Sequence, residues 1–155
     1  METGSLILVV MVEPPAISYS FRRKRMDWPL HITLIPWFKT VDEQAVIESI
    51  KRALGAIPSF ELTVGSDTMF GETSVSLIAD PEPIVDLHNV LLETVAQNVV
   101  FSQMPNWIGN EYQPHITHHD DSRLADGQKV TVKDVTVVRL LPNNICQVVD
   151  IMELQ

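Results

Sequence analysis

The tripeptide His-Ile-Thr occurs twice in the chain, beginning at His31 and again at His115. On a β-strand, residues two apart project from the same face, so His31 shares a face with Thr33, and His115 shares one with Thr117. Imidazole titrates near neutral pH, so one histidine can act as a base and the other as an acid. The hydroxyls can donate hydrogen bonds to the non-bridging oxygens of a phosphoryl group. If the two strands meet, this set of residues suits in-line displacement at phosphorus, and the scheme requires no metal.

The sequence predicts the elements that must position these residues. Both copies lie in short apolar runs, which indicate strands over residues 30–38 and 113–118. A helix is expected to begin with a capping box at Thr40 and Glu43 and to end before Gly55. The remaining elements are expected as a second helix over about 80–99 and strands over 5–12, 60–64, 73–79, 130–141 and 144–153.

Each half of the chain therefore pairs one helix with several strands and carries one His-Ile-Thr. No linker rich in glycine or serine divides the halves. We predict a single α+β domain over residues 1–155, built as two lobes.

Charge limits the classes of function. The 155 residues carry a net charge of −9, with a pI of about 4.8. Affinity for long nucleic acid comes from neutralising backbone phosphates, so this balance argues against binding to a long duplex and to an anionic membrane surface. A small phosphate ligand in a local pocket is compatible with it.

Two features favour the cytoplasm. The apolar run over residues 6–12 is too short to span a bilayer and has no basic segment before it, so we interpret it as a buried central strand. The single cysteine, Cys146, cannot form an internal disulfide, which is typical of a reducing compartment. We expect a cytoplasmic monomer.

The run L-H-I-T-L-I-P-W-F and the later Q-P-H-I-T resemble the paired H-x-T signatures of the 2H phosphoesterase superfamily. The similarity is closest to its bacterial 2′-5′ RNA ligase-like branch. In that branch, a strand pair resembling F-E-L-T-V-G and F-G-E-T-S-V-S-L-I follows the first helix. The resemblance covers residues 5–153.

The resemblance implies a bilobal, pseudo-two-fold fold, with two mainly antiparallel sheets flanked by helices around a central cleft. It implies acid-base catalysis by His31 and His115, with Thr33 and Thr117 beside them, and no metal or other cofactor. The substrates it implies are 2′,3′-cyclic, 1″,2″-cyclic or 2′-5′ phosphodiester linkages, so the expected partner is an RNA end or a small nucleotide.

The chain departs from the family in one place. Many relatives have an arginine shortly after the second motif, where this chain has Asp120. A carboxylate there would repel phosphate, so Arg123 or the basic cluster at residues 22–25 is a candidate replacement. Within that cluster, Arg23 and Arg25 are candidate substrate contacts in an expected loop over 13–28; the alternative is a solvated loop.

Four more residues are candidates for substrate contacts. Trp37 shares strand parity with His31 and can stack on a base, as can Trp107 and Tyr112; packing is the alternative for all three. His119 reaches the catalytic face only if the second strand continues, and the alternative is a solvated strand end.

The other histidines suggest structural positions. Strand alternation sends His118 to the face opposite His115, and the spacing of His118, His119 and Asp120 matches no metal motif, so we expect no metal site. His88, on the second helix, is interpreted as packing.

Two classes of function fit these residues. The first is an enzyme, a cyclic phosphodiesterase with 2′-5′ RNA ligase-like chemistry. The alternatives are a binding module that holds a nucleotide or RNA end without turnover, and a phosphodiesterase of cyclic oligonucleotide signals.

Overall fold

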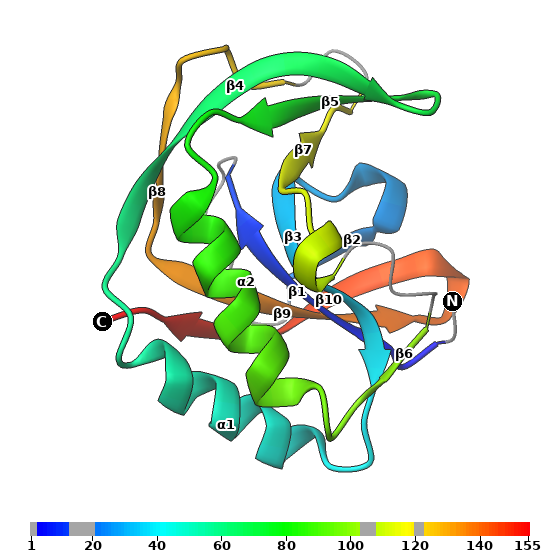
Figure 1. The fold of residues 1–155 in the computed structure, drawn as a ribbon. Helices are drawn as coiled ribbons and strands as arrows, with labels where there is room; N and C mark the ends of the chain where they lie inside the picture. Colours follow the sequence, from blue (N-terminus) through cyan, green and yellow to red (C-terminus); the bar gives the residue numbers. More distant parts are fainter. Residues whose placement is uncertain (1–2, 13–20, 103–107, 120–122) are drawn as a thin grey trace.

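The computed structural model describes residues 3–12, 21–102, 108–119 and 123–155. Two α-helices cover an antiparallel sheet (Figure 1). The strands are β1 (Leu6–Met11), β2 (Arg22–Lys24), β3 (His31–Lys39), β4 (Phe60–Phe70), β5 (Thr73–Ile78), β6 (Val100–Phe101), β7 (His115–Thr117), β8 (Lys129–Val132), β9 (Asp134–Leu141) and β10 (Ile145–Glu153). The helices are α1 (Glu43–Leu54) and α2 (Glu82–Val95), with 3₁₀ turns η1 (Arg25–Asp27), η2 (Gly109–Glu111) and η3 (Pro142–Asn144).

The strands follow the order β2-β10-β9-β1-β3-β7-β5-β4-β8, and β6 adds to β3. The expected antiparallel α+β fold is confirmed. We expected two separate sheets, but the strands form one continuous sheet. The two groups of strands are joined where β3 pairs with β7 and Ile32 lies opposite Ile116. The sequence halves also exchange strands: β9 from the second half pairs with β1, while β5 from the first half pairs with β7.

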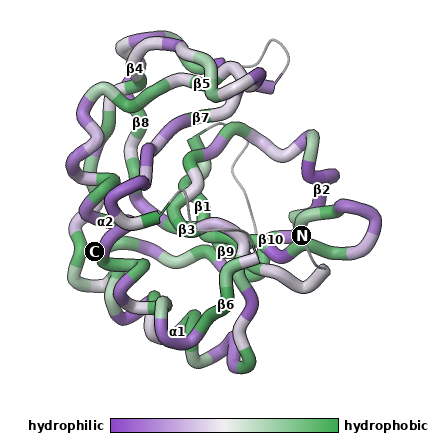
Figure 2. Tube along the Cα trace, turned by 45° about the vertical axis from the view of Figure 1, so that its right-hand side comes forward, coloured by the Kyte–Doolittle hydropathy of each residue, from purple (hydrophilic) through white to green (hydrophobic). Residues whose placement is uncertain are grey.

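The two faces of the sheet bury different clusters. Along β1 and β3, one set of residues, including Val10, Ile32 and Leu34, joins the main core beneath α1 and α2. The alternate residues on the other face, including Ile7 and Val9, join a smaller cluster that contains Trp37. Figure 2 shows hydrophobic segments gathered around β1, β3 and β9, and a hydrophilic β2 at the edge. The run over residues 6–12 is therefore a central strand, as expected.

The beginnings of the helices differ from the expectation. Asp42, not Thr40, caps α1, and its carboxylate accepts a hydrogen bond from Ala45 N at 3.1 Å. Thr40 instead donates its hydroxyl proton to the carbonyl of Asn98, tying the end of β3 to the segment after α2. The hydroxyl oxygen of Thr40 accepts from Asp42 N at 3.4 Å, before the helix begins, so the capping box does not form. The second helix ends at Val95 rather than near residue 99, where the chain turns to form β6.

Several strand boundaries also differ from the expectation. The strand expected over 60–64 continues to Phe70, because its second part pairs with β5, and the strand expected over 113–118 covers only His115–Thr117. Residues 22–24, expected in a loop, form β2 because they pair with the edge of β10. The expected strand over 130–141 divides into β8 and β9, because its first part pairs with β4 and its second with β1. β4 itself changes its pairing partner from β8 to β5 at a bulge near Gly65. A Cβ atom added at Gly65 would lie 3.1 Å from the backbone of Leu77 and Ala79, so the close approach of the two strands favours glycine there.

None of the helices in the described part of the chain is long and apolar enough to cross a membrane.

The junction between β3 and β7 gives the first testable prediction. Ile116 is fully buried opposite Ile32, and truncating a buried isoleucine to alanine typically costs about 2–5 kcal/mol. We expect Ile116→Ala to lower the free energy of unfolding by that amount in urea titrations. Val41→Ala, at an exposed position, should change it by less than about 0.5 kcal/mol. Equal effects of the two substitutions would contradict this reading of the junction.

Candidate active site

The pairing of β3 with β7 brings the two motifs onto one face. The antiparallel register places Ile32 opposite Ile116. Continued by one residue each way, it places His31 opposite Thr117, and Thr33 opposite His115. Directly opposed residues have Cβ atoms about 4.5–5.5 Å apart and project from the same face. Each histidine therefore faces the threonine of the other motif, and the two pairs are related by an approximate two-fold axis between the isoleucines.

The backbone fixes the tautomer of each motif histidine. Nδ1 of His31 lies 2.9 Å from the carbonyl oxygen of Pro29, and Nδ1 of His115 lies 2.8 Å from that of Gln113. A carbonyl oxygen only accepts, so each Nδ1 donates its proton. In the neutral ring the lone pair is then on Nε2, so an acid-base role would use that nitrogen.

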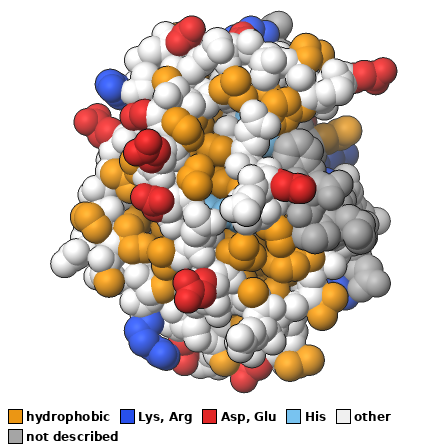
Figure 3. Space-filling view, viewed as in Figure 1, with side chains coloured by type: hydrophobic (Ala, Val, Ile, Leu, Met, Phe, Trp, Pro, Cys, Tyr) orange, Lys and Arg blue, Asp and Glu red, His pale blue; other side chains and the backbone are white. Residues whose placement is uncertain are grey.

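Two adjoining cavities lie over this face. One has a volume of about 340 Å³ and is lined by His115, and the other, about 220 Å³, is lined by His31. Thr33, Thr117 and Trp37 line both cavities, so these residues form the floor where the two meet. In Figure 3, histidine surface is visible among hydrophobic side chains on one face of the molecule. A larger hollow of about 700 Å³ near the start of α1 contains none of the motif residues.

Both motif histidines are held towards the neutral form. Burial lowers the pKa of His31, the hydrogen bond to Pro29 opposes this, and the nearby His119 and His115 lower it further. Burial also lowers the pKa of His115, against the raising effect of the bond to Gln113. Two neutral imidazoles with outward lone pairs can accept protons, and an anion bound between them would favour charging one of them.

Tyr112 supports the floor of the cleft from behind and also lines the larger cavity. Its hydroxyl donates to the carbonyl of Thr33 at 2.8 Å, and its ring stacks on His88 with centroids 3.8 Å apart. His88 is buried; its Nδ1 bonds to the carbonyl of Leu34, and its Nε2 accepts from Gly109 N. His88 is therefore a buried packing residue, as expected, and its two hydrogen bonds also join β3 to η2.

Some of the other predicted contact residues line the cavities, and others do not. Trp37 lines both cavities. His119 and Arg25 line the smaller one beside His31, so His119 is not a solvated strand end. The guanidinium of Arg23 lies 4.9 Å from the ring of Phe21 and lines neither cavity. Trp107 and Asp120 lie outside the described residues.

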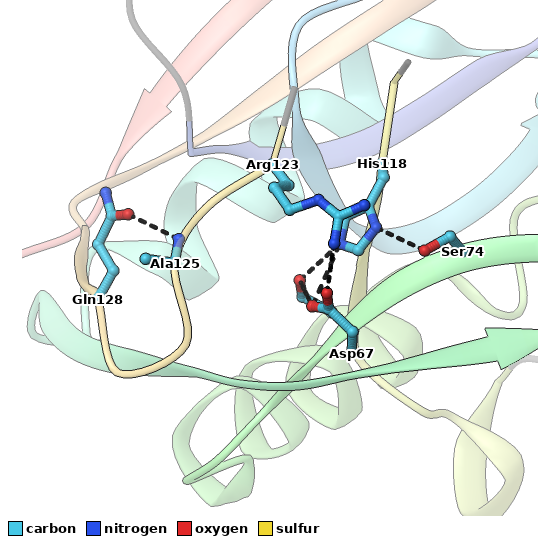
Figure 4. A network of polar contacts seen from close by, with 7 residues as sticks. Asp67, Ser74, His118, Arg123, Ala125 and Gln128 are labelled. Carbon is cyan, nitrogen blue, oxygen red and sulfur yellow. Dashed lines mark hydrogen bonds and ion pairs between the residues drawn. The ribbon is translucent and has the colours of Figure 1, made fainter. Parts of the chain in front are cut away.

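Arg123 does not take the place of the family's arginine. It donates to the carboxylate of Asp67 at 2.6 Å, within a network that also includes His118 (Figure 4). Ser76 donates to Asp67 at 3.0 Å, and the two nitrogens of His118 bond to the hydroxyls of Ser74 and Ser76. These serines alternate with the cleft-lining Thr73 and Val75 on β5, so the network occupies the reverse face, as expected for His118.

Sequence reasoning missed two aromatic residues at the site. Phe70 meets the ring of His115 edge-on, with centroids 4.8 Å apart, and Trp28 lines the cavity of His31. Trp28 lies three positions before His31 in the sequence, and this proximity to the motif could have indicated that it lies near the site. Nε1 of Trp28 and Nε2 of His119 are buried without a hydrogen-bond partner among the described residues, and such groups cost about 1–3 kcal/mol each. In the same part of the chain, no three His, Cys, Asp or Glu side chains are grouped so as to hold a metal ion.

The chain is similar to a known protein family and to several solved structures. A family model described as the 2′-5′ RNA ligase superfamily matches residues 16–137. A crystal structure of a phosphoesterase shares 16% identity, with a TM-score of 0.63 and 99% of each chain covered. E. coli LigT complexed with 3′-AMP shares 15%, with a TM-score of 0.61 and 99% of each chain covered. TT0787 of Thermus thermophilus shares 16%, with a TM-score of 0.63 and 97% of each chain covered. No curated protein sequence matches the chain.

The lowered histidine pKa values predict how stability depends on pH. Burial lowers the pKa of His31, His88, His115 and His118 below 6.5, so the unfolded chain binds more protons than the folded one. The stability is complete above pH 6.5 and is lost as the pH falls below it, by up to about 1.4 kcal/mol per pH unit for each histidine. Urea unfolding at pH 7.5 and 5.5 should show the decrease, and a smaller one for His31→Gln. Equal or greater stability at pH 5.5 would contradict the burial of these rings.

Proposed function

The chain belongs to the 2′-5′ RNA ligase superfamily, and on this premise we propose that it is a metal-independent phosphodiesterase with 2′-5′ RNA ligase-like chemistry. Its substrates are 2′,3′-cyclic phosphates or 2′-5′ phosphodiester linkages at an RNA end or in a nucleotide. The observation that carries the proposal is the pairing of β3 with β7 at Ile32 and Ile116, with the histidine and the threonine of both motifs lining two adjoining cavities.

The reaction needs one neutral and one charged histidine. Nε2 of the neutral histidine takes a proton from water as the water oxygen forms a bond to phosphorus. On the opposite side the bond from phosphorus to the ribose oxygen breaks, and the imidazolium gives its Nε2 proton to that oxygen. One proton is taken up and one is released, so His31 and His115 exchange charge states in each turnover and reverse roles in ligation.

The threonines serve the same step. Thr33 and Thr117 line both cavities, so their hydroxyls lie where a phosphoryl group between the histidines would place its non-bridging oxygens. A donor aimed at developing negative charge typically contributes about 10²–10³ in rate.

The lowered pKa values fit this scheme only with substrate bound. Without a ligand, burial favours two neutral imidazoles. A phosphate anion between them stabilises the charged form of one, so the substrate itself creates the acid.

The larger cavity suits the nucleoside. Phe70, Trp37 and Tyr112 line it beside His115, and aromatic faces stack on bases without regard to sequence. The solved structure of LigT with 3′-AMP, which has a similar fold, supports a nucleotide as the ligand. Buried Cys146 is the only cysteine, which fits the reducing cytoplasm.

One observation keeps a second function under consideration. The preference of both histidines for the neutral form, together with Asp120 in the family's arginine position, also fits a module that binds a nucleotide or RNA end without turnover. A phosphodiesterase of cyclic oligonucleotide signals would use the same four residues, and a substrate panel separates it from RNA processing.

The catalytic proposal predicts the effect of four substitutions. With EDTA present, the protein should open 2′,3′-cyclic nucleotides, a cyclic-phosphate-ended RNA or a 2′-5′ dinucleotide, measured by chromatography of the products. His31→Ala and His115→Ala should each lower kcat by about 10²–10⁴. Thr33→Val and Thr117→Val should each lower kcat by about 10²–10³.

Thr131→Val is the matched control, because Thr131 is an exposed strand threonine on β8 that lines neither cavity. It should retain full activity. Turnover that survives both histidine substitutions would refute two-histidine catalysis. Tight nucleotide binding with no turnover on any substrate would favour the binding module.

A further inference from the structure

The two ends of the cleft differ in chemistry. Around His115 the larger cavity is lined by apolar and aromatic side chains and by neutral polar ones. Around His31 the smaller cavity also has a cation, Arg25, whose guanidinium lies 5.9 Å from the ring centroid of Trp37. Because Trp37 lines both cavities, Arg25 stands at the border of the reaction floor.

A second donor beside this cavity is buried. Trp28 lines the same cavity and is only 4% exposed, and its Nε1 is a buried donor without a partner among the described residues. An indole nitrogen only donates, so what it lacks is an acceptor. Nε1 of Trp28 has almost no accessible surface, so it does not bond to a ligand in this cavity as the side chains stand. An oxyanion in the cavity would instead lie near the exposed guanidinium of Arg25.

The positive charge extends from the cavity along β2. Cys146 lines the cavity, and in the ladder of β2 with β10 it lies directly opposite Arg23. Opposed residues of an antiparallel pair share a face, so Arg23 is on the cavity side of β2, two residues before Arg25.

The described part of the protein does not neutralise these cations. Arg22, Arg23, Lys24 and Arg25 are all exposed, and none of them forms an ion pair with another described residue. They make up 4 of the 11 basic residues of a chain whose net charge is −9. A concentrated positive strip in an acidic protein attracts anions to one place.

We propose that Arg25, continued by Arg23, forms a subsite for a second phosphate of the substrate, next to the phosphate that reacts between the histidines. The preferred ligand is therefore a nucleotide with at least two separate phosphates, such as the end of an RNA chain, over a nucleoside cyclic phosphate. The inference rests on the proposed function for the position of the reacting phosphate, and it names the substrate class of that site.

Equilibrium binding tests the subsite without requiring turnover. Adenosine 3′-phosphate and adenosine 3′,5′-bisphosphate would be titrated calorimetrically into the protein. We expect the second phosphate to tighten binding about tenfold, since a charge-assisted hydrogen bond to phosphate contributes that much or more. In Arg25→Gln the ratio of the two dissociation constants should fall close to one, and Arg25→Lys should restore part of it.

Arg52→Gln is the matched control, because Arg52 is an exposed arginine on α1 that lines neither cavity. Its ratio should stay near that of the wild-type protein. The dependence of log Kd on log salt for the bisphosphate should weaken in Arg25→Gln and stay unchanged in Arg52→Gln. Thermal unfolding of each variant would confirm that it is folded.

A trinucleotide with a 3′-phosphate tests the continuation along β2. It should bind more tightly than the bisphosphate, and Arg23→Gln should remove that increment. Equal affinity of the trinucleotide and the bisphosphate would refute the role of Arg23.

Other outcomes separate this inference from the catalytic proposal. If the wild-type protein binds both adenosine ligands equally, or if Arg25→Gln weakens both by the same factor, the subsite is refuted whether or not turnover occurs. If the preference for the bisphosphate is present but no substrate is turned over, the subsite stands and catalysis is refuted.

Discussion

One cross-strand pair holds the site together. Ile32 and Ile116 are fully buried where β3 meets β7, and this is the point at which two groups of strands become one path. Because side chains alternate along a strand, burying these isoleucines beneath the helices obliges the flanking histidines and threonines to face the cleft. A slip of one residue in either strand would send its polar side chains into the core. The stability of the core and the geometry of the cleft therefore depend on the same register.

The protein uses its five histidines in different ways, according to the face on which each lies. His31 and His115 each donate from Nδ1 to a carbonyl two residues earlier, and both residues line the cleft. His88 and His118 have both ring nitrogens bonded to protein groups and serve to join elements. His119 lines the cavity of His31, and its Nε2 has no partner among the described residues. Buried polar groups that are fully bonded rigidify a fold, whereas unpartnered ones at a cavity can bond to a ligand.

Charge is distributed so that an acidic protein can hold an anion. On the reverse face of β5, Arg123 is neutralised by Asp67. On the cleft side, Arg25 is next to the cavity and forms no ion pair among the described residues. Burial lowers the pKa of both motif histidines and so favours their neutral form. On the proposed function, the cleft would select a ligand that brings its own negative charge, while the net negative charge of the chain disfavours long polyanions.

The sequence by itself determined the strand identity of both motifs, the faces of His31, His115 and His118, and the family, because alternation and residue type are local properties. The tertiary structure decided which elements meet. Asp42 took the capping role expected of Thr40, whose hydroxyl binds Asn98. Residues 22–24 became a strand only by pairing with β10, and the run from residue 130 was divided between two partners. The opposition of His31 to Thr117, and the place of Trp28 and Arg25 beside the cleft, depend on pairings between distant segments. No local pattern encodes such register, because it is set by burial of the whole sheet.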